Sequence, residues 1–192
     1  MKSTARTTAV IARMTRRGRT QGVSRRAPGL LPDTVPAVHD DPAIVARQLG
    51  RPPLPFTRVA ARCGAGRPVV VEQPPATPAG TPFPTTFWLT CPGLVAAIGR
   101  LESAGGVAAL ERRLEEDPEL AAAFRAARGR QIALRPSGAP LGIGGTRREL
   151  AVKCLHAHAA FALGAGDYPI GDEIVAAAGG IPEPCCMAED PA

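Results

Sequence analysis

The stretch TRRELAVKCLHAHAAFAL, residues 146–163, has the strongest helix-start signal in the chain and decides the predicted fold. Thr146 and Glu149 form a capping box, in which the side chain of each accepts a hydrogen bond from the free backbone N–H of the other. Apolar residues follow at helical spacing. We therefore expect a central helix that starts at Thr146, reaches Leu163 and stops at the glycines just beyond it.

Around this helix the sequence predicts a small sheet and further helices. The expected strands are residues 56–62, 68–73 and 85–89. The other expected helices, most of which begin beside an Asp or a Pro, are 42–49, 92–104, 107–116, 118–132 and 172–178. Together they predict an α+β domain, a small antiparallel sheet of two or three strands packed by about five helices.

Positive charge is concentrated at the N-terminus. The formal net charge is +6, but residues 1–36 hold Lys2 and seven arginines against Asp33 alone, so the rest of the chain is nearly neutral. We expect residues 1–36 to form a disordered basic tail. Its open interpretations are a nucleic-acid or anionic-lipid arm, a transit peptide or an over-extended translation start. Residues 37–192 should form one globular domain, with a mobile tail from about residue 181, whose folded body binds no nucleic acid.

The absence of membrane and signal segments and the spacing of the cysteines both favour a cytoplasmic protein. No run of 18 apolar residues and no apolar signal-peptide region occurs, so we expect a cytoplasmic protein without a membrane span. The five cysteines are odd in number and unevenly spaced, which is not typical of a disulfide framework. They are expected to be reduced thiols or metal ligands.

A metal site is one interpretation of the cysteines. Cys154 and His158 are four residues apart on the predicted helix, and with Cys63 and Cys91 they would form a Cys₃His site suited to zinc or an iron–sulfur cluster. The alternative is that Cys154 and His158 pack in the core. We favour the core, because the chain has no C-x₂-C pair and free cysteine is among the most buried residue types.

A second candidate site is the glycine-rich loop before the predicted helix. Free N–H groups and the helix dipole attract phosphate at such a position. The candidate anion-binding residues are Gly144, Gly145, Thr146, Arg147, Arg148, Lys153 and His156. The loop lacks the spacing of a P-loop, so the alternative is ordinary loop chemistry before a capping box.

The only Trp and two of the five Phe lie between residues 83 and 92. Such aromatic density is typical of a core strand or, alternatively, of a partner surface. We expect a core strand, because one face of a strand is normally buried.

Three segments are familiar together: PFPTTFWLTCPGLVAAIGRLESAGG, LEEDPELAAAFRAA and VKCLHAHAAFALGAGDYPIGDE. They resemble the actinobacterial domain-of-unknown-function family 501 over about residues 40–180. The resemblance implies no activity. Members are typically encoded beside a septum-formation initiator and an exopolyphosphatase-like protein, which implies a cell-envelope or phosphate-metabolism setting by association. After Cys63 this chain has Gly-Ala-Gly where relatives often have Pro and sometimes a second Cys.

Two function classes follow. The first is a small cytoplasmic accessory or interaction protein, with an unidentified protein partner, whose Cys/His cluster is structural or metal-binding. The alternative is an enzyme or sensor for a phosphate-bearing ligand that uses the loop 142–148 with Lys153 and His156. Convergence of Cys63, Cys91, Cys154 and His158 in space would favour a metal site, and scatter would favour core packing.

Overall fold

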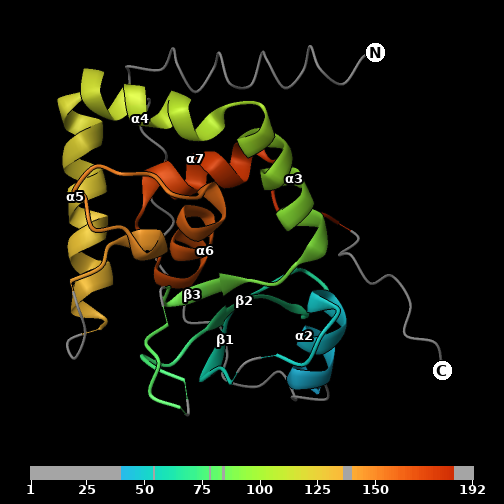
Figure 1. Ribbon diagram of the computed structural model, residues 1–192. Coiled ribbons are helices and arrows are strands. Elements are labelled where there is room, and N and C mark those ends of the chain that lie inside the picture. The colour runs from blue at the N-terminus through green and yellow to red at the C-terminus, as the bar shows by residue number, and fades with distance from the viewer. Residues whose placement is uncertain (1–39, 54, 78, 84, 136–139, 184–192) are drawn as a thin grey trace.

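A three-stranded antiparallel sheet forms the base of the fold (Figure 1). The structure is a computed structural model that describes residues 40–53, 55–77, 79–83, 85–135 and 140–183. The strands are β1 (Arg58–Arg62), β2 (Pro68–Glu72) and β3 (Phe87–Leu89), in the order β1-β2-β3. Central strand β2 is buried from Pro68 to Val71, which suits its run of valines.

Six α-helices complete the described part of the chain. They are α2 (Asp41–Leu49), α3 (Pro92–Ser103), α4 (Gly106–Glu116), α5 (Pro118–Ala133), α6 (Leu155–Ala165) and α7 (Pro169–Ala177). Helices α3 to α7 gather on one side of the sheet, and α2 lies apart from them beside the strands (Figure 1). Helix α6 packs against all three strands and against α7, so it is the central helix. The predicted α+β class with a small antiparallel sheet is confirmed.

The predicted start of the central helix is wrong. Helix α6 begins at Leu155, and the residues from Thr146 to Cys154 form turns and extended chain. Thr146 caps no helix; its carbonyl and hydroxyl oxygens both accept hydrogen bonds from Arg128. Glu149 forms an exposed ion pair with Arg125 at 3.0 Å. The capping box therefore does not form, because helix α5 binds both of its members.

Two carboxylates from other helices set the true start of α6. The N-cap residue Cys154 is extended, with φ −162°, and its side chain makes no capping hydrogen bond. Instead, the N–H of Leu155 donates to Glu102 of α3, and the N–H of Val152 donates to Glu111 of α4. The first N–H groups of a helix need such partners, so long-range contacts place this helix end.

Helix α6 is held on the sheet by aromatic packing. The rings of Phe87 in β3 and Phe161 in α6 meet edge to face at 5.9 Å. Glycines allow the close approach: a Cβ at Gly164 would overlap the Phe87 ring, and one at Gly171 of α7 would overlap Ala162. These contacts fix the C-terminal half of α6 against β3 and α7.

The chain ends and helix boundaries bear on three other predictions. Helix α7 begins at Pro169, earlier than predicted, because a proline suits the first turn.

The predicted tail 1–36 and most of the tail from 181 lie outside the described residues, although Glu183 accepts a hydrogen bond from the Gly64 N–H. No single described helix is long and apolar enough to cross a membrane; α3 with α4 meets that test only as a pair bent by 68°.

Candidate functional site

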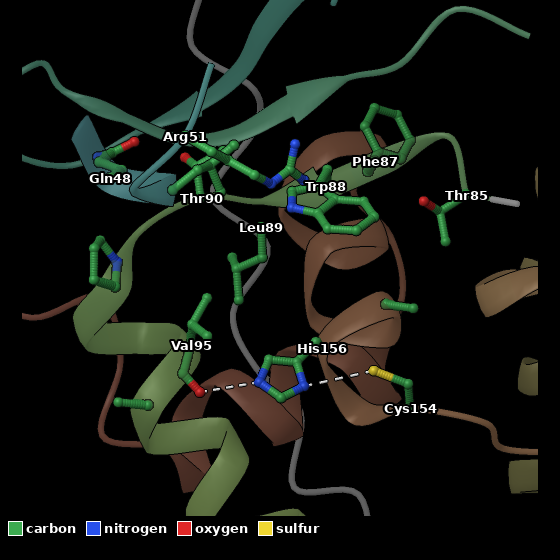
Figure 2. A pocket seen from close by; sticks show the side chains of 14 residues that line it. Gln48, Arg51, Thr85, Phe87, Trp88, Leu89, Thr90, Val95, Cys154 and His156 are labelled. Carbon is green, nitrogen blue, oxygen red and sulfur yellow. Dashed lines mark hydrogen bonds between the residues drawn. The ribbon is translucent and has the colours of Figure 1, made fainter. Parts of the chain in front are cut away.

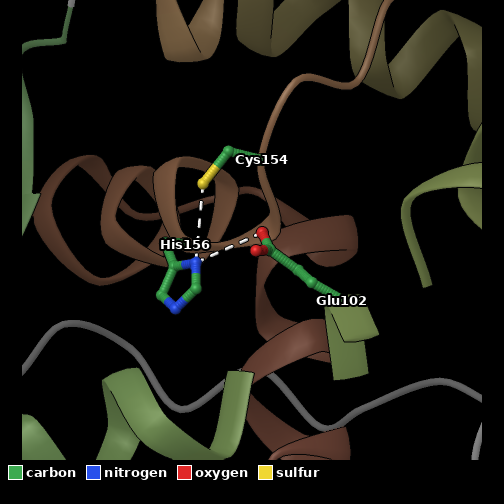
Figure 3. Close-up of side chains that lie close together, drawn as sticks. All are labelled: Glu102, Cys154 and His156. Carbon is green, nitrogen blue, oxygen red and sulfur yellow. Dashed lines mark hydrogen bonds and ion pairs between the residues drawn. The ribbon is translucent and has the colours of Figure 1, made fainter. Parts of the chain in front are cut away.

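Three potential metal ligands meet where α3 packs against the first turn of α6 (Figure 3). Nδ1 of His156 lies 3.5 Å from Sγ of Cys154 and 3.2 Å from Oε1 of Glu102. One ligand atom from each residue lies within 4.8 Å of the other two, and all three residues are partly buried. We call these residues the ECH cluster.

A backbone carbonyl sets the orientation of the His156 ring. Its Nε2 is 2.9 Å from the carbonyl oxygen of Val95, which can only accept, so Nε2 carries a proton and donates. Nδ1 then points toward Cys154 and Glu102. In the neutral imidazole, Nδ1 presents its lone pair to those two groups; in the imidazolium, it donates a proton to them.

The surroundings of His156 favour the charged ring. Its hydrogen bond with Cys154, helped by the Val95 carbonyl and the charge of Glu102, raises the pKa of His156 to about 9 although burial lowers it. Near neutral pH the metal-free ring is therefore an imidazolium. A metal ion bound at Nδ1 would have to displace that proton.

Beside the ECH cluster lies a groove of about 600 Å³, a size typical of small-molecule sites. Its walls come from the C-terminal end of α2, from β3, and from the first turns of α3 and α6. We call it the β3 groove. Figure 2 shows Cys154 and His156 at one end of the groove and Gln48 and Arg51 at the opposite end.

The β3 groove is mainly apolar and contains buried polar atoms without partners among the described residues. Trp88 and Val95 belong to its apolar lining. Gln48 is 8% exposed and donates from Nε2 to the Pro68 carbonyl, whereas its Oε1 meets no partner. Oγ1 of Thr85 is also buried and unpartnered. Both oxygens are enclosed by protein atoms, so they lie in the wall of the groove rather than on its surface.

Comparison with known proteins assigns the family. The family model described as "Protein of unknown function (DUF501)" matches residues 59–140 and 136–176. The chain belongs to the DUF501 family. All three residues of the ECH cluster lie inside the matched region. No curated protein and no solved structure matches this chain, so the function has to be argued from the site itself.

This DUF501 protein does not bring the four predicted Cys₃His ligands together. Within the described ranges, no three of Cys63, Cys91, Cys154 and His158 form a metal-ligand group. Cys63 and Cys91 are part of the hydrophobic core. His158 is fully buried, and its Nδ1 lies 2.8 Å from the hydroxyl of Tyr168. The geometry at these three positions fits the alternative of core packing.

The predicted anion-binding set of this DUF501 protein is also divided. No helix starts after the loop, so its glycines and Thr146 have no helix dipole behind them. Arg128 already bonds the carbonyl oxygens of Pro140, Thr146 and Arg147 and holds the loop. Arg147, Arg148 and Lys153 are exposed. His156 belongs to the ECH cluster instead.

The ECH cluster thus joins one residue from each predicted site with one that the sequence did not indicate. Cys154 came from the metal set and His156 from the anion set. Glu102 lies in the last turn of α3, where a carboxylate looks like an ordinary solvated residue. No spacing links it to residues more than fifty positions away, so sequence reasoning missed it.

Proposed function

We propose that this DUF501 protein binds a zinc-class divalent ion through Glu102, Cys154 and His156, and that the ion acts on a ligand held in the β3 groove. The observation that carries the proposal is the meeting of these three side chains, two of which, Cys154 and His156, line that groove. This makes the protein a candidate metal-dependent enzyme and refines the predicted metal-binding cluster.

The donor atoms suit zinc in kind and in number. Zinc binds thiolate, imidazole and carboxylate, and catalytic zinc sites use three protein ligands with a fourth position left for water or substrate. Softer ions such as Cu(I) prefer more sulfur, and Mg²⁺ or Ca²⁺ prefers oxygen alone. One sulfur, one nitrogen and one oxygen therefore favour zinc.

The distances between the donor atoms also suit zinc. Metal–ligand bonds of about 2.0–2.3 Å in a tetrahedron place neighbouring ligand atoms about 3.3–3.8 Å apart. Nδ1 of His156 lies 3.5 Å from Sγ of Cys154 and 3.2 Å from Oε1 of Glu102. The remaining pair, Sγ of Cys154 and the carboxylate of Glu102, lies within 4.8 Å, so the three donors would have to close only slightly around an ion.

The Val95 carbonyl supplies the outer contact expected of a metal-binding histidine. Such histidines usually donate their second ring N–H to a carbonyl or carboxylate, which fixes the tautomer that binds the metal. His156 makes this bond through Nε2. Glu102 is held in turn by the N–H of Leu155, so two of the three ligands are oriented by neighbouring groups.

An ion at this position would polarise a bound carbonyl or phosphoryl group, or lower the pKa of a bound water to about 7. Cys154 and His156 both line the β3 groove, so the fourth position would open toward a ligand there. Metal-assisted hydrolysis is therefore the reaction class we propose.

A second candidate function rests on the same pair of residues without metal. The pKa of His156 is raised to about 9, chiefly by its hydrogen bond with Cys154, and a histidine within hydrogen-bond reach of a thiol is the arrangement of a cysteine nucleophile. In that case Cys154 would attack a substrate in the groove directly.

Zinc titration of the metal-free protein tests the first function. Isothermal titration should give one Zn²⁺ per chain, and Cys154→Ser, His156→Gln and Glu102→Gln should each weaken binding at least about 100-fold, because each removes a ligand. Cobalt(II) in place of zinc should show a sulfur-to-metal absorption band that Cys154→Ser removes. All measurements use a Cys185→Ser/Cys186→Ser background, so that only the remaining thiols can bind the ion.

Cys63→Ala, Cys91→Ala and His158→Gln are the matched controls and should retain zinc affinity. Affinity that is unchanged in His156→Gln, or lost in Cys63→Ala and Cys91→Ala, would overturn the ECH cluster as the metal site. If Zn²⁺ does not bind, the rate of iodoacetamide labelling of Cys154 tests the thiol function, which requires fast labelling that His156→Gln slows.

A further inference from the structure

Strand β3 has one free edge within the described residues. It pairs with β2 on one side, and no strand follows it on the other. The N–H of Thr90 donates to the Val69 carbonyl, and the Thr86 carbonyl accepts from the N–H of Gln73. Because backbone groups alternate along a strand, those of the two intervening odd-numbered residues, Phe87 and Leu89, point away from β2.

The β3 groove runs along this free edge. Its lining includes Thr85 and every residue from Phe87 to Thr90, so the whole strand forms one wall. The end of helix α2 and the first turns of α3 and α6 contribute the rest of the lining. Phe87 and Leu89 line the groove and are 5% and 6% exposed, and their backbone groups on the unpaired side are two residues apart, which is the repeat that an added strand requires.

Two further features describe what the groove would accept. Trp88 is 38% exposed and, with Val95, offers apolar surface to side chains. Arg51 lies at one end, and none of the described residues that line the groove carries a carboxylate. Backbone pairing, apolar contacts and a carboxylate thus fit the same groove.

We propose that the free edge of β3 binds an extended peptide as a fourth strand, with apolar side chains in the groove and a carboxylate beside Arg51. Peptides recognised in this way gain affinity from main-chain hydrogen bonds and selectivity from pockets for their side chains. The bound backbone would pass close to Cys154 and His156. Only the statement that this peptide is a substrate rests on the proposed function.

Amide hydrogen exchange followed by NMR tests the pairing residue by residue. The probe is an acetylated hexapeptide of alternating threonine and valine with a free carboxyl terminus, titrated to about 5 mM so that a millimolar site is seen. Exchange of the Phe87 and Leu89 amides should slow about fivefold at this peptide concentration for a dissociation constant of about 1 mM, because only these amides gain partners. The Trp88 amide, already paired with β2, should not change.

A peptide N-methylated at every residue is the matched probe, since it keeps the side chains and loses the backbone donors of both edges. It should leave Phe87 and Leu89 unprotected. Equal protection by the N-methylated peptide, or no protection by any peptide, would overturn strand addition. Trp88 is the only Trp in the chain, so its fluorescence reports groove occupancy independently.

Arginine variants test whether Arg51 binds a carboxylate of the peptide. Arg51→Gln should weaken binding of the free-acid peptide about two- to fivefold, the range of an exposed ion pair. Arg100→Gln, an exposed site on α3 outside the groove, should have no effect. Two further peptides have an amidated terminus, and one of them also carries an internal aspartate. They show whether the bound carboxylate comes from the terminus or from a side chain. Equal affinity of all three peptides would overturn the role of Arg51.

The same measurements in Glu102→Gln separate this inference from the proposed function, because Glu102 is a proposed zinc ligand that does not line the groove. Strand addition should persist there while zinc binding is lost. Zinc binding without amide protection would defeat the peptide edge alone, and amide protection without zinc binding in the native protein would defeat the metal centre alone.

Discussion

His156 and His158 lie two residues apart on α6 and meet opposite surroundings. The side chain of His156 is 24% exposed, faces the β3 groove, and has its pKa raised to about 9. His158 is fully buried, and burial lowers its pKa to about 4. Two helical steps turn the chain by about 200°, so the two rings leave the helix on nearly opposite sides.

Within one short motif, one histidine therefore has a chemical role and the other a packing role. His156 contacts Sγ of Cys154 and Oε1 of Glu102, two potential metal ligands, and lines the β3 groove. His158 contacts Tyr168 and, at 5.2 Å between ring centres, Phe124. Burial raises the pKa of Tyr168, so its hydroxyl keeps the proton and can donate it to Nδ1 of His158. One histidine is available to a ligand, and the other stabilises the contact between α6 and α7.

The largest expected effect is on stability when each histidine is removed. His158→Ala should cost about 3–4 kcal/mol of unfolding free energy, because it leaves a cavity and a buried Tyr168 hydroxyl without its partner. His156→Ala, measured without metal, should cost about 1 kcal/mol, since its site is partly solvated. Urea unfolding measures both, and equal losses would contradict the division of roles.

The second largest effect is the loss of folding stability in acid, which we expect to come from the buried His158. Above pH 6.5 the His158 ring is neutral in both the folded and the unfolded chain. Between pH 6.5 and 4 only the unfolded chain takes up the proton, so stability falls by about 3 kcal/mol as the pH is lowered through this window. His158→Gln should lose this part of the pH dependence. A native slope that His158→Gln leaves unchanged would show that other groups cause it.

The close contact around His158 gives a third test. A Cβ at Gly171 would overlap Ala162 and the backbone carbonyl of His158, which cannot move aside easily. Gly171→Ala should therefore cost about 2 kcal/mol through overpacking. Gly99→Ala on α3 is the control, because nothing lies near its added methyl and alanine favours the helix by up to about 1 kcal/mol. The midpoints of thermal unfolding should move in opposite directions.

The smallest effect concerns where α6 begins, which decides how the two histidines are presented. Glu149→Gln should cost less than about 0.5 kcal/mol, because it breaks only an exposed ion pair with Arg125. Asp117→Ala should cost about 1 kcal/mol, since Asp117 caps α5 by accepting the N–H groups of Glu119 and Leu120. If Glu149→Gln cost more stability than Asp117→Ala, the result would favour the capping box predicted from sequence over the observed ion pair.

Local patterns in the sequence determined most of the fold. The helix start at Asp40 was predictable because its side chain accepts the N–H of Ala43, three residues further on, and Gly50 ends the same helix in the left-handed conformation. The hairpin of β1 and β2 and the start of α5 were predictable for the same reason. Each of these signals acts between residues that are close in the chain, where propensity and capping operate.

Only the tertiary structure decided the site. The start of α6 depends on Glu102 and Glu111, whose carboxylates accept N–H groups from residues 53 and 41 positions further along the chain. A local capping box competes with such contacts and loses when its members pair with another helix, as Glu149 does with Arg125. Helix packing then brings Glu102 to Cys154 and His156, a meeting that no spacing in the sequence encodes.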